Sequence, residues 1–225
     1  MTPAPAVLLF DVNETLSDMS PMADRFTEVG APAALAKTWF ASLLRDGFAL
    51  TVTGDNPGFA DVGRAVLRPM LSAELRPTDV DDAVEHVLAG FGQLSLHPDV
   101  EAGVRRLHDA GVRLVTLSNG STTVAQGLFE RAGLLDCFEQ LLTVEDAPRW
   151  KPAPESYAYG LGVCGVPASE AMLVAVHPWD LHGARAAGLR TAWVTRTRGT
   201  YPAHMARPEV AASGIDDLAR QLAEG

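Results

Sequence analysis

Apolar positions divide the chain into a short first strand, a helical stretch and a long alternating region. Residues 7–10 form an unbroken apolar run of strand length that ends at Asp11. Between residues 19 and 95 the apolar positions recur mainly at helical spacing, and we expect no strand there. Four helices are predicted in this stretch, one opening at Ser20 and Pro21 and the others over 33–46, 55–73 and 78–90. Gly47 is expected to end the second of these helices.

The second half of the chain alternates between predicted helices and strands. We expect helices at 98–110, 121–132, 154–163, 179–187 and 215–223, and strands at 112–117, 141–144, 172–176 and 191–195. Residues 196–212 are polar with scattered Pro and Gly, and are expected to form a loop. Repeated strand–helix–strand units predict an α/β fold, with a parallel sheet covered by helices on both faces. We therefore expect an α/β core of residues 1–18 and 96–225, into which residues 19–95 are inserted as a helical subdomain.

Composition and charge describe an ordinary globular chain and exclude several partners. The 225 residues are 47% hydrophobic and 20% charged, which is enough to bury a sizeable core. The formal net charge of −10 argues against nucleic-acid binding, and no apolar run reaches the roughly 20 residues of a membrane span. The N-terminus lacks a basic region, so we expect no signal peptide. Cys137 and Cys164 fit no disulfide framework or metal spacing, which favours reduced thiols and a cytoplasmic location.

Polar residues follow three of the predicted strands, at the sheet edge where open α/β proteins bind their ligands. Asp11 follows the first strand, and the runs Thr-Leu-Ser-Asn-Gly at 116–120 and Ala-Val-His-Pro-Trp-Asp at 175–180 end two others. A Trp-Lys-Pro run lies at 150–152. Asp11 as a nucleophile would need an ionised carboxylate, and a nearby lysine such as Lys151 would lower its pKa. The plainer interpretation is a solvated strand exit and a surface lysine.

These four stretches, in this order, resemble the four motifs of the haloacid dehalogenase superfamily, and the resemblance runs over nearly the whole chain. The chain looks most like the L-2-haloacid dehalogenase branch. Asn13 stands where the superfamily's phosphatases carry a second aspartate, and Tyr157 lies six residues after Lys151, as is typical of that branch. The resemblance implies a Rossmann-like core and makes residues 19–95 a helical cap.

The resemblance also implies catalytic roles for single residues. Asp11 corresponds to the nucleophile, Thr15 to the residue that orients it, and Lys151 to the cation that balances its charge. Asp180 corresponds to the acid that holds the lysine and positions the hydrolytic water. Plainer alternatives remain open: Thr15 is then a turn hydroxyl, and Asp180 an acid stabilised by the start of a helix.

A second group of residues corresponds to the substrate-binding positions of the dehalogenases. The family residue that matches Ser118 binds the substrate carboxylate, and the one that matches Asn119 lies near the leaving halide. Backbone N–H groups at a helix start attract anions, although Ser118 is equally suited to capping that helix. Tyr157 and Trp179 are either site residues or ordinary aromatic packing.

Two positions depart from the family pattern. The family's cap arginine, which binds the leaving group, directly follows a tryptophan, whereas Phe40 follows Trp39 here and Arg45 points to another helix face. Ala175 and His177 replace the serine and asparagine that are usual in the last motif. His177 is structural, or a cation near the halide or substrate carboxylate, or a neutral base for the hydrolytic water, and we favour the base.

The function that the resemblance implies is hydrolytic dehalogenation of a small 2-haloalkanoic acid, through an ester on Asp11, to a 2-hydroxy acid and halide. The substrate is then a small organic anion, no cofactor is needed, and a homodimer is suggested by the resemblance alone. One alternative is a Mg²⁺-dependent phosphatase acting on a small phosphate ester. Asn13 disfavours the phosphatase, because it is not a second acid. The last motif also offers Asp180 as its one obvious carboxylate for a metal, and whether Asp146 lies close enough to contribute is left open. The other alternative is a catalytically weak binding protein of the same fold.

Overall fold

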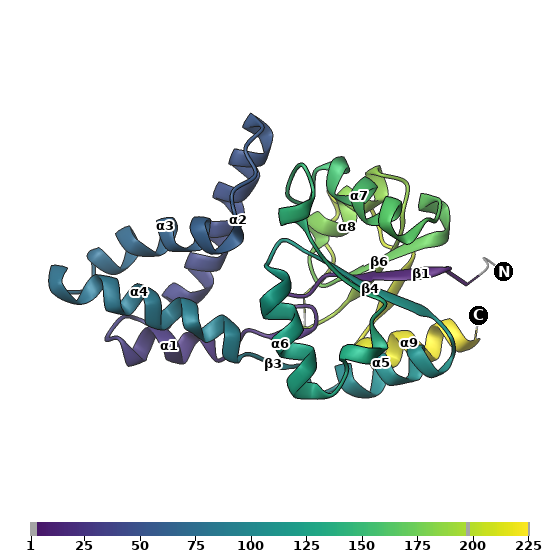
Figure 1. Cartoon of the computed structure of the whole chain (residues 1–225), viewed down its shortest axis with the longest axis horizontal. Coiled ribbons are helices and arrows are strands. Elements are labelled where there is room, and N and C mark those ends of the chain that lie inside the picture. The colour runs from purple at the N-terminus through teal and green to yellow at the C-terminus, as the bar shows by residue number, and fades with distance from the viewer. Residues whose placement is uncertain (1–3, 197–198, 225) are drawn as a thin grey trace.

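The computed structural model of the chain describes residues 4–196 and 199–224 and is built around a six-stranded sheet (Figure 1). The strand order is β5-β4-β1-β6-β7-β8, and each neighbouring pair is parallel. The strands are β1 (Val7–Phe10), β4 (Arg113–Ser118), β5 (Gln140–Thr143), β6 (Ala171–Ala175), β7 (Arg190–Val194) and β8 (Val210–Ala212). The α/β class and the parallel sheet are thus confirmed, and the five strands that the sequence predicts agree to within one residue.

Helices cover both faces of the sheet, because successive side chains of a strand point to opposite sides. In β1, Val7 and Leu9 belong to one buried cluster, which includes residues of α7 and α8. Leu8 and Phe10 belong to a second cluster, which includes residues of α5, α6 and α9. These helices are α5 (Val100–Asp109), α6 (Thr122–Ala132), α7 (Pro154–Cys164), α8 (Pro178–Ala186) and α9 (Ile215–Glu224).

Four further helices lie to one side of the sheet and form what we call the helical region (Figure 1). They are α1 (Met22–Glu28), α2 (Leu35–Thr53), α3 (Phe59–Ser72) and α4 (Val80–Ala89). Trp39 of α2 lies at their centre, between Phe26 and Phe91, and its indole N–H donates to the Gly63 carbonyl at 2.9 Å. Two short antiparallel strands, β2 (Ser17–Asp18) and β3 (Ser95–Leu96), pair where the chain enters and leaves this region.

Gly47 does not end a helix, so that prediction is wrong. Helix α2 continues through it to Thr53, and Gly54 ends the helix with a left-handed φ of 98°. Gly47 is required for a different reason, since a Cβ there would collide with the indole ring of Trp150. The glycine therefore lets a helix of the helical region approach a loop of the α/β part closely.

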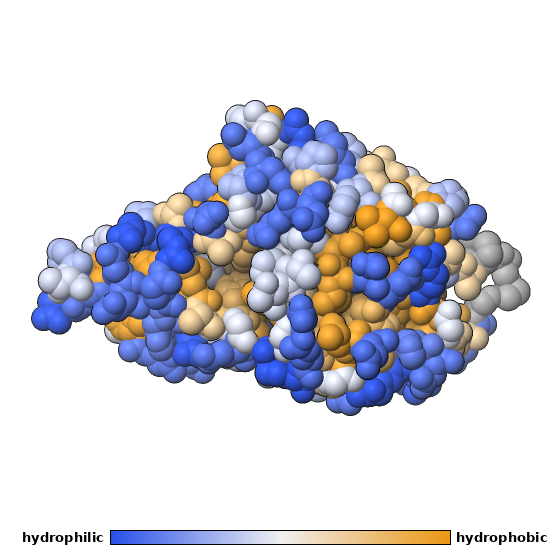
Figure 2. Space-filling model, viewed as in Figure 1, coloured by the Kyte–Doolittle hydropathy of each residue, from blue (hydrophilic) through white to orange (hydrophobic). Residues whose placement is uncertain are grey.

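The loop predicted at 196–212 is wrong at its end, where β8 adds an edge strand to β7. Residues 197–198 of that predicted loop lie outside the described residues, as do residues 1–3 and 225 of the predicted core. None of the helices in the described ranges is long and apolar enough to cross a bilayer. On the face shown in Figure 2, hydrophobic residues gather over the α/β part, while the outer end of the helical region is mainly hydrophilic.

Candidate active site

The polar residues singled out from the sequence meet at the carboxyl edge of the sheet. β1 lies between β4 and β6, so the turns that follow these three strands are neighbours. They carry Asp11 after β1, Asn119 after β4 and His177 after β6. Pro178 at the first turn of α8 fixes the start of that helix, and Asp180 lies in the same turn. Lys151 comes from the loop between β5 and α7.

Asp11 is almost fully buried and accepts hydrogen bonds on both carboxylate oxygens. Its Oδ1 accepts from Lys151 Nζ at 3.0 Å, while Oδ2 lies 2.6 Å from Thr15 Oγ1 and 3.1 Å from His177 Nδ1. Burial by itself would raise the pKa of Asp11, but the charge of Lys151 and the donors on Oδ2 hold that pKa well below its usual value. Asp11 is therefore ionised throughout the neutral range.

Lys151 is completely buried between two carboxylates. Its Nζ lies 3.0 Å from Asp11 Oδ1 and 2.6 Å from Asp180 Oδ2. Burial disfavours the charged amine, but the charges of Asp11 and Asp180 outweigh burial and raise the pKa of Lys151. The lysine is thus a permanent cation that holds the nucleophile and the last-motif acid in one hydrogen-bonded chain.

Asp180 is held on its other side by Tyr157. The tyrosine hydroxyl lies 2.7 Å from Asp180 Oδ1, and both side chains are fully buried. Burial raises the pKa of Asp180, Lys151 opposes that rise, and the charge of Asp11 adds to it. Burial and Asp180 together raise the pKa of Tyr157 well above 10, so its hydroxyl stays protonated and can donate. Tyr157 therefore acts on Asp180, and a direct contact between Tyr157 and a substrate remains a prediction.

His177 lies between two carboxylates. Its Nδ1 is 3.1 Å from Asp11 Oδ2, and its Nε2 is 2.9 Å from Glu14 Oε2. Burial lowers the pKa of a histidine, but hydrogen bonds to Asp11 and Glu14 and their charges raise the pKa of His177 to about 9. An imidazolium has no free lone pair with which to take a proton from water. Of the roles that the sequence left open for His177, the geometry favours the cation over the base.

Glu14 is a residue of this site that the sequence analysis did not single out. It sits in the turn between Asp11 and Thr15, in the left-handed region with a φ of 60°. That backbone conformation is uncommon for a residue with a side chain. The one signal in the sequence was a carboxylate three positions after the candidate nucleophile, and its spacing gave no indication of a partner on another strand.

Asn119 binds the backbone of the lysine loop, whereas the Ser118 hydroxyl can still donate to a ligand. Asn119 Oδ1 accepts from the Lys151 backbone N–H at 3.0 Å, and its Nδ2 donates to the Lys151 carbonyl at 3.1 Å, so this amide clamps the lysine loop. Ser118 Oγ accepts from the Gly120 N–H at 2.9 Å. Among the residues described, the hydroxyl hydrogen of Ser118 has no acceptor and remains available to a ligand. The ligand contact predicted for Asn119 is not tested by this geometry.

Two cavities are lined by residues of the turn that follows Asp11. A small one, of about 100 Å³, lies between the helical region and α6, and Asn13, Phe59 and Ser118 help to line it. The first turn of α6 also lines this cavity, and its free backbone N–H groups suit an anion. A larger one, of about 710 Å³, opens on the other side and is lined by Glu14, Phe40 and His177.

Aromatic rings from the helical region close the site. The Phe40 ring centroid is 6.3 Å from that of His177, so the residue in the family arginine's place does face the reacting groups. Trp179 packs between His177 and Phe48, with centroid distances of 5.1 and 4.9 Å. Phe59 stacks on Trp150 with a centroid distance of 5.8 Å. The site is thus enclosed by apolar walls around a charged centre.

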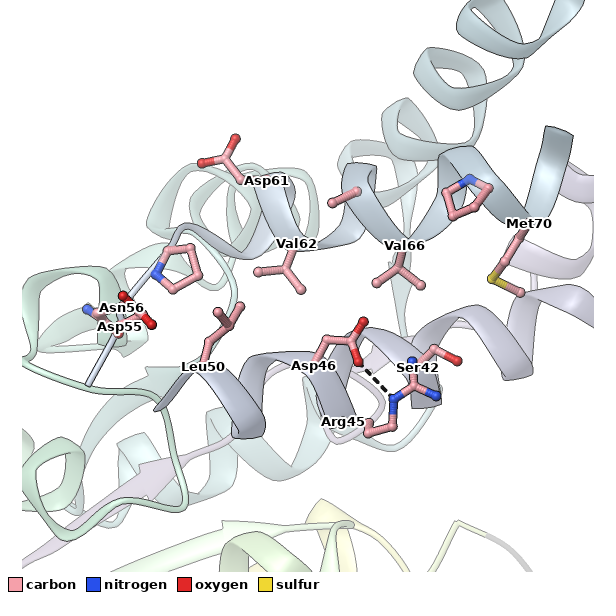
Figure 3. Close-up of a pocket in the computed structure, with 13 residues that line it drawn as sticks. Ser42, Arg45, Asp46, Leu50, Asp55, Asn56, Asp61, Val62, Val66 and Met70 are labelled. Carbon is pink, nitrogen blue, oxygen red and sulfur yellow. Dashed lines mark hydrogen bonds and ion pairs between the residues drawn. The ribbon is translucent and has the colours of Figure 1, made fainter. Parts of the chain in front are cut away.

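Another groove lies away from this site. About 780 Å³ in size, it lies between α2 and α3, where Figure 3 shows Val62, Val66 and Met70 of α3 pointing toward α2, and Leu50 of α2 pointing toward α3. Arg45 lines this groove and is paired with Asp46 at 2.8 Å, whereas Phe40 lines the cavity of His177, so the two residues lie on different faces of α2, as the helical spacing predicted. Within the described ranges, no group of three His, Cys, Asp or Glu residues is arranged to hold a metal ion.

Comparisons with known proteins place the chain in a family. The model of the haloacid dehalogenase-like hydrolases matches residues 5–188, and the chain belongs to that family. Haloacetate dehalogenase H-2 of Moraxella sp. (strain B) is 35% identical over 104 residues, which are 46% of each chain. The (S)-2-haloacid dehalogenase 2 of Pseudomonas sp. (strain CBS-3) is 32% identical over 124 residues, covering 55% of this chain and 54% of that protein. The chain therefore spans about half the length of these two relatives.

Solved structures are similar over almost the whole length. L-2-haloacid dehalogenase from Xanthobacter autotrophicus, with chloropropionic acid covalently bound, has a TM-score of 0.84 and 25% identity. The alignment covers 98% of this chain and 99% of that one. The chain is thus similar to the L-2-haloacid dehalogenases in sequence and in fold.

Proposed function

We propose that the protein hydrolyses the carbon–halogen bond of a small 2-haloalkanoic acid, giving a 2-hydroxy acid and halide through an ester on Asp11. The observation that carries this proposal is the state of Asp11: a buried, permanently ionised carboxylate whose charge is balanced by Lys151, with Asn13 in place of a second acid two residues further on. The relatives named for 2-haloacid and haloacetate dehalogenation, and the covalent chloropropionic acid of a structural neighbour, support it.

The first step uses Oδ1 of Asp11 as the nucleophile. A carboxylate oxygen offers about two lone-pair sites, and on Oδ2 both are taken by Thr15 and His177. Among the residues described, Oδ1 has one donor, Lys151 Nζ, and keeps a lone pair for attack. A bond forms between Oδ1 and the halogenated carbon, the carbon–halogen bond breaks, and the halide leaves with its electron pair.

The substrate carboxylate would lie in the small cavity beside Asp11. The Ser118 hydroxyl and the backbone N–H groups of the first turn of α6 point to a site for an anion there. A volume of about 100 Å³ suits a two- or three-carbon acid. The surrounding aromatic rings exclude water from the first displacement.

In the second step, water attacks the ester carbonyl carbon of Asp11. The bond from that carbon to Oδ1 breaks, and Oδ1 leaves as the hydroxyl oxygen of the product, with one proton from the water. We assign the other proton first to Asp180, because burial raises its pKa and because Lys151 links it to Asp11. Aspartate is regenerated, and the overall products are halide, a proton and the 2-hydroxy acid.

A panel of 2-haloacids and simple phosphate esters, assayed with and without EDTA, tests the function. We expect halide release from at least one short 2-haloacid, at the same rate with and without the chelator, because Asn13 offers no second carboxylate for Mg²⁺. Phosphate release that requires Mg²⁺, with no halide release from any haloacid, would contradict the proposal.

We also propose three features that accompany this function. Residues 19–95 act as a cap on a core of residues 1–18 and 96–225, since the two short strands β2 and β3 pair at the crossing points. The chain forms a homodimer, which rests on resemblance alone, and sedimentation would test it. The free thiols Cys137 and Cys164 fit a reducing compartment such as the cytoplasm.

A further inference from the structure

Glu14 occupies a backbone position that favours glycine. It is the one non-glycine residue with a positive φ in the described ranges, at 60°. Such residues are found where the surrounding structure over-determines them, often at functional sites. The side chain that this conformation presents is a carboxylate 2.9 Å from His177 Nε2, so the turn delivers a charge to the site.

The contacts of His177 fix both its charge and its orientation. An ionised carboxylate accepts hydrogen bonds and donates none. Nδ1 faces Asp11 Oδ2 and Nε2 faces Glu14 Oε2, an arrangement that suits an imidazolium donating a hydrogen bond to each carboxylate. Removing the Glu14 carboxylate would release Nε2 and leave Asp11 as the one carboxylate on the ring.

Thr15 supplies the second donor to the same oxygen. The Val176 backbone N–H donates to Thr15 Oγ1 at 3.0 Å, which directs the threonine's own hydrogen to Asp11 Oδ2 at 2.6 Å. Val176 directly precedes His177, so one short segment after β6 sets both donors. The two donors therefore converge on Oδ2 from fixed positions.

We propose that Thr15 and His177 form the oxyanion-binding site for hydrolysis of the Asp11 ester, and that Glu14 is the positioning residue that keeps the His177 ring charged and aligned. The proposal rests on the proposed function, because it concerns the ester that this function requires. When Oδ1 carries the substrate carbon, Oδ2 is the carbonyl oxygen of the ester. Attack by water on the carbonyl carbon moves an electron pair onto Oδ2, and the two donors stabilise that charge.

Other charged groups near His177 do not replace Glu14. Lys37 from α2 and Arg196 after β7 line the same larger cavity and would oppose a second cation, while burial lowers the pKa of His97, which also lines it. Asp18 is the other carboxylate that lines this cavity, and it accepts a hydrogen bond from the Ser20 backbone N–H at 2.8 Å. On its other sides His177 meets the rings of Phe40 and Trp179. The pKa of about 9 agrees with a ring whose charge depends on Asp11 and Glu14 together.

The charge of His177 can be measured without any substrate. Protein labelled with ¹⁵N-histidine, titrated by NMR, should show a protonated His177 at pH 7.5 that titrates near pH 9. In Glu14→Gln we expect its pKa to fall by about one pH unit or more, because one charged acceptor is lost. An unchanged titration in the variant, or a neutral His177 at pH 7.5 in the native protein, would overturn the assignment of Glu14.

Rapid-quench mass spectrometry tests the catalytic half of the proposal. In Glu14→Gln the Asp11 ester should accumulate, because its hydrolysis slows by about 10- to 100-fold while its formation changes little. Glu28→Gln is the matched control, since Glu28 also pairs with a histidine, His86 at 2.6 Å, far from the site. This control should show native rates.

The outcomes separate this proposal from the proposed function. If Glu14→Gln forms and hydrolyses the ester at native rates, or slows both steps equally, the oxyanion assignment is wrong while dehalogenation stands. If no haloacid is turned over by the native protein, the proposed function fails and the oxyanion assignment fails with it. The NMR titration then decides alone whether Glu14 sets the charge of His177.

Discussion

At the scale of single residues, His177 changes the charge of the site. The dehalogenases that the sequence resembles place an asparagine there and an arginine on the cap, whereas this chain has a cationic histidine and Phe40. The Phe40 ring faces His177, so the positively charged side chain at this place belongs to the α/β part and not to the helical region. This chain thus has its positive charge at position 177 instead of position 40. His177 directly follows Val176, whose backbone N–H orients Thr15.

The pH dependence of ester hydrolysis follows from this charge. The folded-state pKa of His177, about 9, lies above its ordinary value of 6.5, so the ring is charged below pH 9 and loses its proton as pH rises through that value. Formation of the ester removes the negative charge of Asp11, which lowers the pKa of His177 below its value in the free enzyme. We therefore expect the hydrolysis rate to fall as pH rises through a value below 9. Stopped-flow or quench rates across pH 6–10 would show this limb in the native protein and its absence in His177→Asn. A rate that instead rises through pH 9 would indicate a base.

Two substitutions of Glu14 test whether its backbone conformation is strained. Glu14→Gly and Glu14→Ala both remove the carboxylate, but glycine alone adopts a positive φ without cost. We expect the glycine variant to be more stable than the alanine variant by about 1 kcal/mol, with equally slow ester hydrolysis in both. Thermal unfolding and quench kinetics on the pair would measure this. Equal melting temperatures would show that the turn is not strained.

Much of the site could be predicted from the sequence, and what was missed has a physical reason. Asp11, Lys151 and Asp180 lie in recognisable motifs, and the structure brings them within hydrogen-bonding distance. Glu14 escaped notice because its role depends on a φ angle and on a partner on another strand. The charge of His177 could not be predicted either, because Glu14, the second carboxylate beside its ring, lies far from it in the sequence.

At the scale of elements, the contact between Gly47 and Trp150 joins the helical region to the α/β part. We expect Gly47→Ala to lower the free energy of unfolding by about 1–3 kcal/mol, because the new methyl group displaces the indole ring. Gly162→Ala in α7 is the matched control, since a Cβ there meets no atom within 4 Å of it among the described residues. The control should be neutral or slightly stabilised, as Ala favours a helix. Denaturant unfolding of both variants would measure the difference.

Prediction of elements from the sequence succeeded for the central strands and failed at the end of α2 and at β8. Strand limits were recovered to within one residue because each central strand is a short, mainly apolar run that is almost entirely buried. The end of α2 was misplaced because Gly47 serves close packing, which local sequence does not distinguish from a helix stop. β8 was missed because three residues at a sheet edge carry almost no periodic signal.

At the scale of the whole molecule, the proposed substrate is a small anion, whereas the chain has a net charge of −10. Lys151 and His177 each pair with Asp11 and with one further carboxylate, Asp180 or Glu14, so these two cations keep the nucleophile ionised. The donors left for the proposed anion are the Ser118 hydroxyl and the N–H groups at the start of α6, while the aromatic rings of the helical region exclude water.

The covalent step is the central claim, and one measurement tests it most directly. In a single turnover with excess enzyme in ¹⁸O-water, the label should appear in the side chain of Asp11, and the 2-hydroxy acid should be unlabelled, because its new oxygen comes from Oδ1. Mass spectrometry of the Asp11 peptide and of the product reads both. Label in the product and none in Asp11 would show that water attacks the substrate directly, and would contradict the ester mechanism.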